Sequence, residues 1–172
     1  MRDGTRAVTA GPGDVLLHGM AAGLIGYATI VVFFLIADPV SGRPVFHTPA
    51  LLGGALFFGL REPAGLEIGP GPVLAYNGIH VLVFLLLGFV AAWFARLSER
   101  LPGGWVLAVN LMAFVLFHVY GAFVFFTEPI RAAIPLGGAV GATGLAVAAM
   151  TAYILWAHPR LRRELAADEP PD

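Results

Sequence analysis

The sequence predicts an all-α, polytopic membrane protein with four transmembrane helices and one short helix between the first and second. The chain is 58% hydrophobic and 12% charged, whereas a soluble domain is roughly one quarter charged. The 23 residues from Val73 to Ala95 carry no formal charge, which at ~1.5 Å per residue is enough to cross a bilayer core of ~30 Å. Three other stretches are similarly apolar and long. One membrane domain, residues 15–158, is therefore expected.

The first predicted span runs from Val15 to Ala37. It is too long for the ~7–15-residue apolar core of a signal peptide. Asp14 is placed to cap its first turn, and Asp38-Pro39 is expected to end it, since a proline disfavours helix at the preceding residue. Small residues near one face, Gly26 among them, would let another helix approach closely. That face carries His18, Ala22, Gly26 and Thr29.

The connection from Asp38 to Pro72 is too long for a simple turn between helices and too apolar for a solvated loop. Thr48 is a plausible N-cap and Pro49 a plausible first-turn residue, which predicts a helix over about 49–60. Twelve residues at ~1.5 Å each reach only ~18 Å. That length suits a re-entrant or interfacial helix better than a full crossing.

The second span, Val73 to Ala95, and the third, Gly104 to Thr127, contain polar side chains that need partners in hydrocarbon. Spacings of three and four place these side chains on one face of each helix together with phenylalanine and glycine. The face on the second span comprises Asn77, His80, Phe84, Gly88 and Ala91, and the face on the third comprises Asn110, Phe114, His118 and Gly121, with Tyr120 nearby. Glu128-Pro129 is expected to close the third span.

The fourth span is predicted from Ala132 to Ala157, with Pro135 near its beginning. Its most regular feature is a stripe of small residues, Gly137, Gly141, Gly144 and Ala148. Like Gly26 and Gly88, these residues are predicted helix-packing positions, because small side chains let backbones meet where hydrophobic driving force between helices is weak.

Arginine placement predicts the orientation in the membrane. With four spans, the N-terminal segment 1–14, the loop after the second span and the charged tail 159–172 together hold seven of the ten arginines. The positive-inside rule then places both termini in the cytoplasm of a multi-pass cell-membrane protein. If residues 49–60 crossed instead, the split would be four against six. The three tryptophans also fall near the predicted cytoplasmic interface.

Charge and composition also narrow the function. The net charge of −1 and the scattered arginines give no support for a nucleic-acid partner. With no cysteine there is no thiolate metal site and no covalent haem attachment. The chain lacks a nucleophile elbow, a P-loop and a paired intramembrane carboxylate, so an enzyme acting on a soluble substrate is not expected.

His80 and His118 are predicted to lie at similar depth on antiparallel helices, with His47 approaching from the outer side, and three interpretations are open. The histidines could bond to neighbouring polar groups and fix helix register. They could hold a b-type haem, or with His47 a divalent metal such as zinc or copper. They could also serve proton or small-solute movement, although the absence of acidic residues inside the spans argues against a pump. His18 and His158 form a second possible level, with water as the expected partner of His158.

The leading functional expectation is a non-enzymatic subunit or scaffold of a larger membrane complex. It follows from the small extramembrane mass, the missing catalytic set and the glycine-rich faces. Its partners would be the lipid bilayer and either other membrane subunits or further copies of the chain. The alternatives are a haem- or metal-binding redox protein using His80 and His118, and a small transporter or channel.

Overall fold

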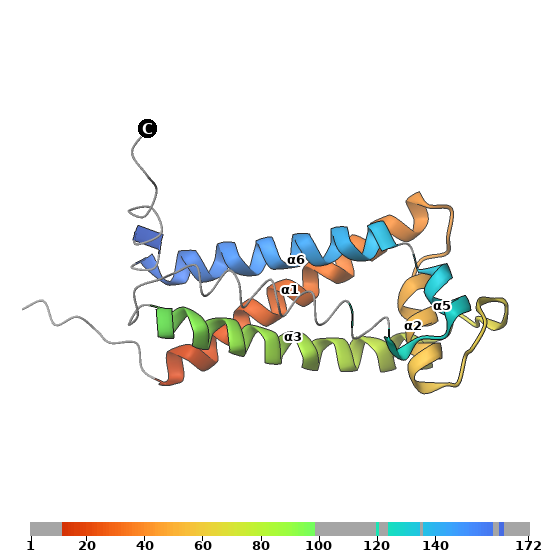
Figure 1. Cartoon of the computed structure of the whole chain (residues 1–172), viewed down its shortest axis with the longest axis horizontal. Helices are drawn as coiled ribbons and strands as arrows, with labels where there is room; N and C mark the ends of the chain where they lie inside the picture. The colour runs from red at the N-terminus through yellow and green to blue at the C-terminus, as the bar shows by residue number, and fades with distance from the viewer. Residues whose placement is uncertain (1–11, 99–119, 121–123, 135, 160–161, 164–172) are drawn as a thin grey trace, which may run out of the picture.

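The computed structural model describes residues 12–98, 120, 124–134, 136–159 and 162–163. Over these residues every regular element is helical (Figure 1). The elements in chain order are α1 (Pro12–Val40), α2 (His47–Phe57), the 3-10 turn η1 (Pro63–Gly65), α3 (Pro70–Ser98), α5 (Glu128–Ala133) and α6 (Leu136–Ala157).

Three helices are long and apolar enough to cross a membrane. They contain the segments Val15–Val40, Pro70–Leu97 and Leu136–Ala157, which correspond to the predicted first, second and fourth spans. The predicted third span, residues 104–127, lies almost entirely outside the described residues. The chain is thus consistent with a multi-pass membrane protein, and the count of four spans stays a prediction.

Contacts along the helices fix their directions. Gly19 and Tyr27 of α1 contact Phe89 and Asn77 of α3, so these two helices are antiparallel. α1 is likewise antiparallel to α6, because His18 contacts Tyr153 near the end of α6. It follows that α3 and α6 run in the same direction. We call the two ends the α2 end, where α2, η1 and α5 gather, and the His18 end (Figure 1).

The interface between α1 and α3 is a seam of glycines. A Cβ added at Gly88 would overlap the carbonyl oxygen of Gly19 and the backbone of Gly23, and one added at Gly19 would lie 2.7 Å from the Cα of Phe89. Gly26 lies against Phe84 and Met150. Gly26 and Gly88 were predicted packing positions, whereas Gly19 and Gly23 were not singled out. The close approach is the geometry that small residues permit between membrane helices.

Helix α6 packs on α1 with a different face from the one predicted. Its buried residues are Ala142, Ala146, Met150 and Ile154, and Gly137, Gly141, Gly144 and Ala148 are all exposed. A Cβ at Gly137 or Gly144 would meet no described atom within 4 Å, and one at Gly141 would come no closer than 3.8 Å to Phe33. A packing role for this stripe stays a prediction, and it concerns a surface outside the described bundle.

Three predicted helix boundaries are wrong. α1 begins at Pro12, so Asp14 lies inside the helix and does not cap it. α1 continues through Pro39 to Val40, because Pro39 lies in the last turn and the next donor, the N–H of Ser41, still reaches the Ala37 carbonyl at 3.0 Å. The expected fourth span is broken at Ile134, which has extended backbone angles (φ −84°, ψ 118°) and ends α5. The physical reason is in the sequence, since Ile134 precedes Pro135 and a residue before proline is driven out of the helical region.

The short helix α2 has 11 residues, about 16 Å at ~1.5 Å per residue. It is therefore too short to cross a bilayer core. Its re-entrant or interfacial placement stays a prediction. An apolar cluster at the α2 end of the bundle holds α2 in place by joining it to α5. The buried members of this cluster are Leu51, Leu52, Phe126, Ile130 and Ile134. A Cβ added at Gly53 would overlap the carbonyl oxygen of Pro72, so α2 also lies directly against the start of α3.

Candidate functional site

Asp38 is the only carboxylate that is fully buried among the described residues. It lies in the last turn of α1 and is 0% exposed. Its Oδ2 accepts the backbone N–H of Thr48 at 2.8 Å, and its Oδ1 accepts the Thr48 hydroxyl at 2.7 Å. The Arg43 Nε lies 3.3 Å from Oδ1 and completes an ion pair. A buried carboxylate needs such partners, because removing an unpaired charge from water is very costly.

The contact between Asp38 and Thr48 docks α2 onto α1. Thr48 was predicted to be the N-cap of α2, but α2 begins at His47 and Phe46 occupies the N-cap position without a side-chain hydrogen bond. The Asp38 carboxylate takes the orphan N–H of Thr48 in its place, so the cap comes from another helix. Phe46 has φ of 66°, a left-handed conformation that costs roughly 1–2 kcal/mol in a residue with a Cβ.

The polar residues of α3 form the opposite wall. The Tyr27 hydroxyl donates to Asn77 Oδ1 at 2.9 Å, and Asn77 Nδ2 donates to the Val73 carbonyl at 2.8 Å. The predicted need of Asn77 for a partner is thus met by α1 and by its own helix. One turn along, the Tyr76 and His80 rings lie with their centroids 4.6 Å apart, and the His80 ring also contacts Phe84 at 5.3 Å.

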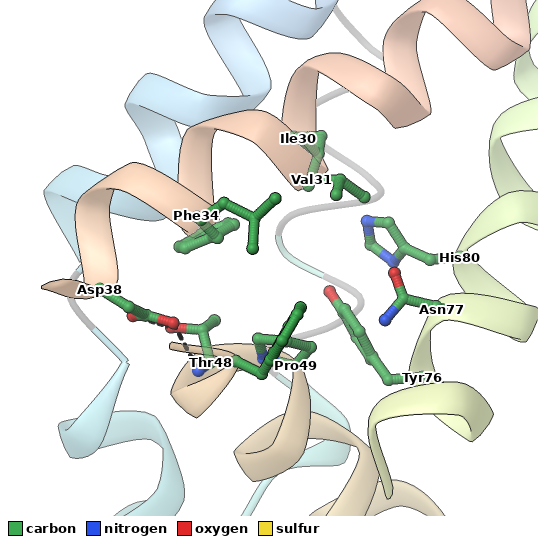
Figure 2. Close-up of a pocket in the computed structure, with 11 residues that line it drawn as sticks. Ile30, Val31, Phe34, Asp38, Thr48, Pro49, Tyr76, Asn77 and His80 are labelled. Carbon is green, nitrogen blue, oxygen red and sulfur yellow. Dashed lines mark hydrogen bonds between the residues drawn. The ribbon is translucent and has the colours of Figure 1, made fainter. Parts of the chain in front are cut away.

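A cavity separates these two walls (Figure 2). Its volume is about 40 Å³, measured as the space open to the centres of water molecules, which is room for roughly two or three waters. The Tyr76 hydroxyl points toward this space in Figure 2 and forms no hydrogen bond with any described residue. The lining residues comprise the polar Asp38, Thr48, Tyr76, Asn77 and His80 and the apolar Ile30, Val31, Phe34, Leu35, Phe46 and Pro49.

Sequence reasoning found part of this site. It singled out Asn77 and His80, and both line the cavity. It treated Asp38 only as a helix end and took the spans to be free of acidic residues, which is wrong because the apolar segment Val15–Val40 contains this buried carboxylate. It also missed Tyr76, although its spacing of four from His80 places the two rings on one face of the helix.

His47 lies beside the cavity and is not among its lining residues. Its Nδ1 is buried and has no hydrogen-bond partner among the described residues. Burial lowers the pKa of His47; nearby Asp38 opposes this shift, and Arg43 adds to it. Burial thus favours the neutral form of the imidazole.

A second polar cluster lies at the His18 end. His18 Nδ1 lies 3.1 Å from the Tyr153 hydroxyl, and the His18 and His158 rings meet edge to face at 5.7 Å. The predicted second level of histidines is therefore present. The expectation that His158 is mainly partnered by water is wrong, because the residue is buried at 5% exposure and its ring packs on that of His18.

The proposed cofactor site gains no support from the described residues. No group of three histidine, aspartate or glutamate side chains in this part of the chain is placed to hold a metal ion. His118 and Asn110 lie outside the described residues, and Tyr120 is 74% exposed. A haem or metal held by His80 and His118, with or without His47, therefore stays a prediction.

Comparison of the chain with protein-family models, with curated proteins and with solved structures finds no match. The chemistry of the cavity is thus the guide to function. A buried acid, a phenol and an imidazole surround a space the size of a few waters, and such a set can bind or pass a small polar solute.

Proposed function

We propose that this multi-pass membrane protein is a small transporter or channel that binds a small polar solute in the cavity beside Asp38. The observation that supports the proposal is the buried carboxylate facing Tyr76 and His80 across a space for water-sized molecules. Polar and ionisable groups inside membrane segments are costly, and they commonly mark the path of a solute or proton. The buried acid also removes the objection that the spans hold no acidic group.

The proposal includes four spans with both termini in the cytoplasm, which puts the α2 end at the outer face of the membrane. The parallel directions of α3 and α6 support an additional crossing between them. The arginine count supports the orientation. In this arrangement the solute would enter from the outer side, past the turn between α1 and α2.

The test is solute flux in proteoliposomes that contain the full chain. Stopped-flow light scattering would follow small neutral solutes, and an internal pH dye would follow protons and ammonium. We expect flux above that of empty liposomes, and a several-fold loss in Tyr76→Phe and His80→Ala. Glu67→Gln is the matched control, because Glu67 is exposed and lies outside the cavity. Equal flux in empty liposomes, wild type and both cavity variants would end the proposal.

A second candidate function is that of a subunit or scaffold in a larger membrane complex or self-assembly. The observation that favours it is the exposed small-residue face of α6, Gly137, Gly141, Gly144 and Ala148. Because the chain has no cysteine, single cysteines can test this face. Gly144→Cys should cross-link to a neighbouring chain in membranes, whereas Ala146→Cys, which is buried against α1, should not. A wild-type chain that remained monomeric in mild detergent and carried no co-purified protein would rule out this candidate.

The cofactor interpretation has a direct test of its own. An absorption spectrum of the gently purified protein would show a Soret band if His80 and His118 held a haem, and metal analysis would find zinc or copper if they held a metal. The absence of both signals would remove this interpretation and would leave the transport proposal unchanged.

A further inference from the structure

We propose that the cavity binds a small monovalent cation of the ammonium class, which donates an N–H to the Tyr76 hydroxyl and is attracted by the nearby charge of Asp38. This inference rests on the proposed function only in naming the class of solute for the same cavity. Three features of the site support it: its charge, the geometry of the Asp38–Arg43 pair and the residues that form the cavity walls (Figure 2).

The electrostatics of the site favour a cation. Asp38 is the one acidic side chain on the cavity wall, and it is fully shielded from solvent. It lies in the last turn of α1, where the unsatisfied carbonyl groups of a helix add a partial negative charge. The first turn of α2 compensates part of this charge through the Thr48 N–H. Arg43 is the only cation paired with the carboxylate in the described chain.

The Arg43 pair is poorly formed. Its Nε lies 3.3 Å from Asp38 Oδ1, yet the same nitrogen is buried without a hydrogen bond to any described atom. The N–H is therefore not aligned with the carboxylate, and much of the strength of a charge-assisted hydrogen bond is missing. The Arg43 side chain is 22% exposed, so it can turn toward water. Arg43 therefore compensates the charge of Asp38 only in part, and the remaining negative charge attracts a cation into the cavity.

The walls suit a nitrogen cation better than a metal ion. Aromatic rings of Phe34, Phe46 and Tyr76 line the cavity, and such rings attract ammonium groups across their faces. The Tyr76 hydroxyl points into the space and can accept one N–H. Calcium requires six to eight oxygen ligands, whereas only four lining side chains carry oxygen. The volume of about 40 Å³ admits ammonium or methylammonium.

The experiment measures binding at equilibrium, without a gradient. The full chain in mild detergent at neutral pH and constant ionic strength is titrated with methylammonium chloride against sodium chloride and tetramethylammonium chloride, and the midpoint of thermal unfolding is followed. We expect only methylammonium to raise the midpoint, because ligands that bind the native state stabilise it by mass action. Sodium and tetramethylammonium both lack N–H donors.

Variants give the proposal a signature that a general salt effect would not produce. Arg43→Gln removes the positive charge that compensates part of Asp38, so methylammonium should bind several-fold more tightly than to wild type. Asp38→Asn should abolish the midpoint shift, and Glu62→Gln, an exposed residue of the same charge, should leave it unchanged. If Asp38→Asn does not fold, the comparison of Arg43→Gln with wild type still decides the question.

Two results would overturn the inference: no methylammonium effect in either wild type or Arg43→Gln, or equal effects of sodium and methylammonium. These results are distinct from failure of the proposed function. Methylammonium binding without flux would support the cation site and reject transport. Flux of neutral solutes without methylammonium binding would support transport and reject the cation site.

Discussion

Glycines are packed against another helix in one region of this bundle and are exposed in another. Gly88 lies in the seam between α1 and α3, where its backbone touches that of Gly19 and Gly23. Gly144 on α6 faces outward, and no described atom comes within 4 Å of the place where its Cβ would be. Both positions belong to regularly spaced small residues in apolar helices. A small-residue stripe therefore shows that close approach is possible, and it does not show which neighbour makes it.

The neighbouring residues explain the difference. On α6 the positions that face α1 are Ala142, Ala146, Met150 and Ile154, a series with a spacing of four. This series offers both small residues and large apolar side chains that fill the space beside α1. The glycine stripe lies on a neighbouring face of the helix and is left exposed. On α3, by contrast, Gly88 shares its face with the buried Phe84 and Ala91, so its own face is the one that packs.

The largest expected loss of stability comes from a mutation in the glycine seam between α1 and α3. Gly88→Ala should destabilise the protein by about 3 kcal/mol or more, because the new methyl overlaps the Gly19 carbonyl and the two helices must separate. Gly144→Ala is the matched control and should be neutral or slightly stabilising, since it adds helix propensity where space is open. Steric trapping or thermal unfolding in detergent would measure both. Similar losses in the two variants would show that α6 also packs through its glycines.

The next largest effect concerns the two faces of α6. Ala146 is fully buried and Ala148 is exposed. Ala146→Leu should cost about 1–3 kcal/mol through overpacking against α1, whereas Ala148→Leu should change stability by no more than about 0.5 kcal/mol in a monomer. If Ala148→Leu instead disrupts an oligomer seen by cross-linking, the exposed stripe is an interface between chains. In that case one face of α6 packs within the chain, against α1, and the other packs against a second chain.

A smaller effect tests whether polar contacts add to the seam. Tyr27→Phe removes the donor to Asn77 Oδ1 and should cost about 0.6 kcal/mol, the average for hydrogen bonds between membrane helices. Tyr76→Phe removes a hydroxyl that bonds to no described residue, so it should leave the stability nearly unchanged while it alters the cavity. A loss above about 2 kcal/mol for Tyr27→Phe would mean that the polar contact rivals the glycines in holding α1 to α3.

The sequence predicts the parts of this structure that depend on neighbouring residues. Apolar runs locate α1, α3 and most of α6, and the 11-residue α2 emerges from the length of its apolar stretch. The break at Ile134 is also local, because it follows from Pro135. The cavity depends on contacts between distant residues. Asp38 caps α2 across ten positions, and Tyr27 reaches Asn77 across fifty.

Periodicity alone cannot supply such contacts, because it places a residue on a face without naming what that face meets. This limitation accounts for the errors at Thr48 and at the α6 stripe. Thr48 has the composition of an N-cap, yet its hydroxyl and N–H both donate to Asp38. Gly144 has the spacing of a packing residue, yet the space around it is open to the described bundle.

The smallest expected effect is at α2, which makes its own close glycine contact through Gly53 and Pro72. Burial lowers the pKa of the adjacent His47 below its ordinary 6.5. The unfolded chain then binds more protons than the folded chain as the pH falls below about 6.5, so stability declines with acidification and the loss is complete below the folded pKa. The thermal midpoint of wild type should therefore fall slightly between about pH 7.5 and 5.5 relative to His47→Gln, in which this proton cannot bind. The other histidines are common to both chains and cancel in the difference. Parallel pH profiles would show that His47 does not weaken α2 docking, and the glycine contact would then be the simpler account of how α2 is held.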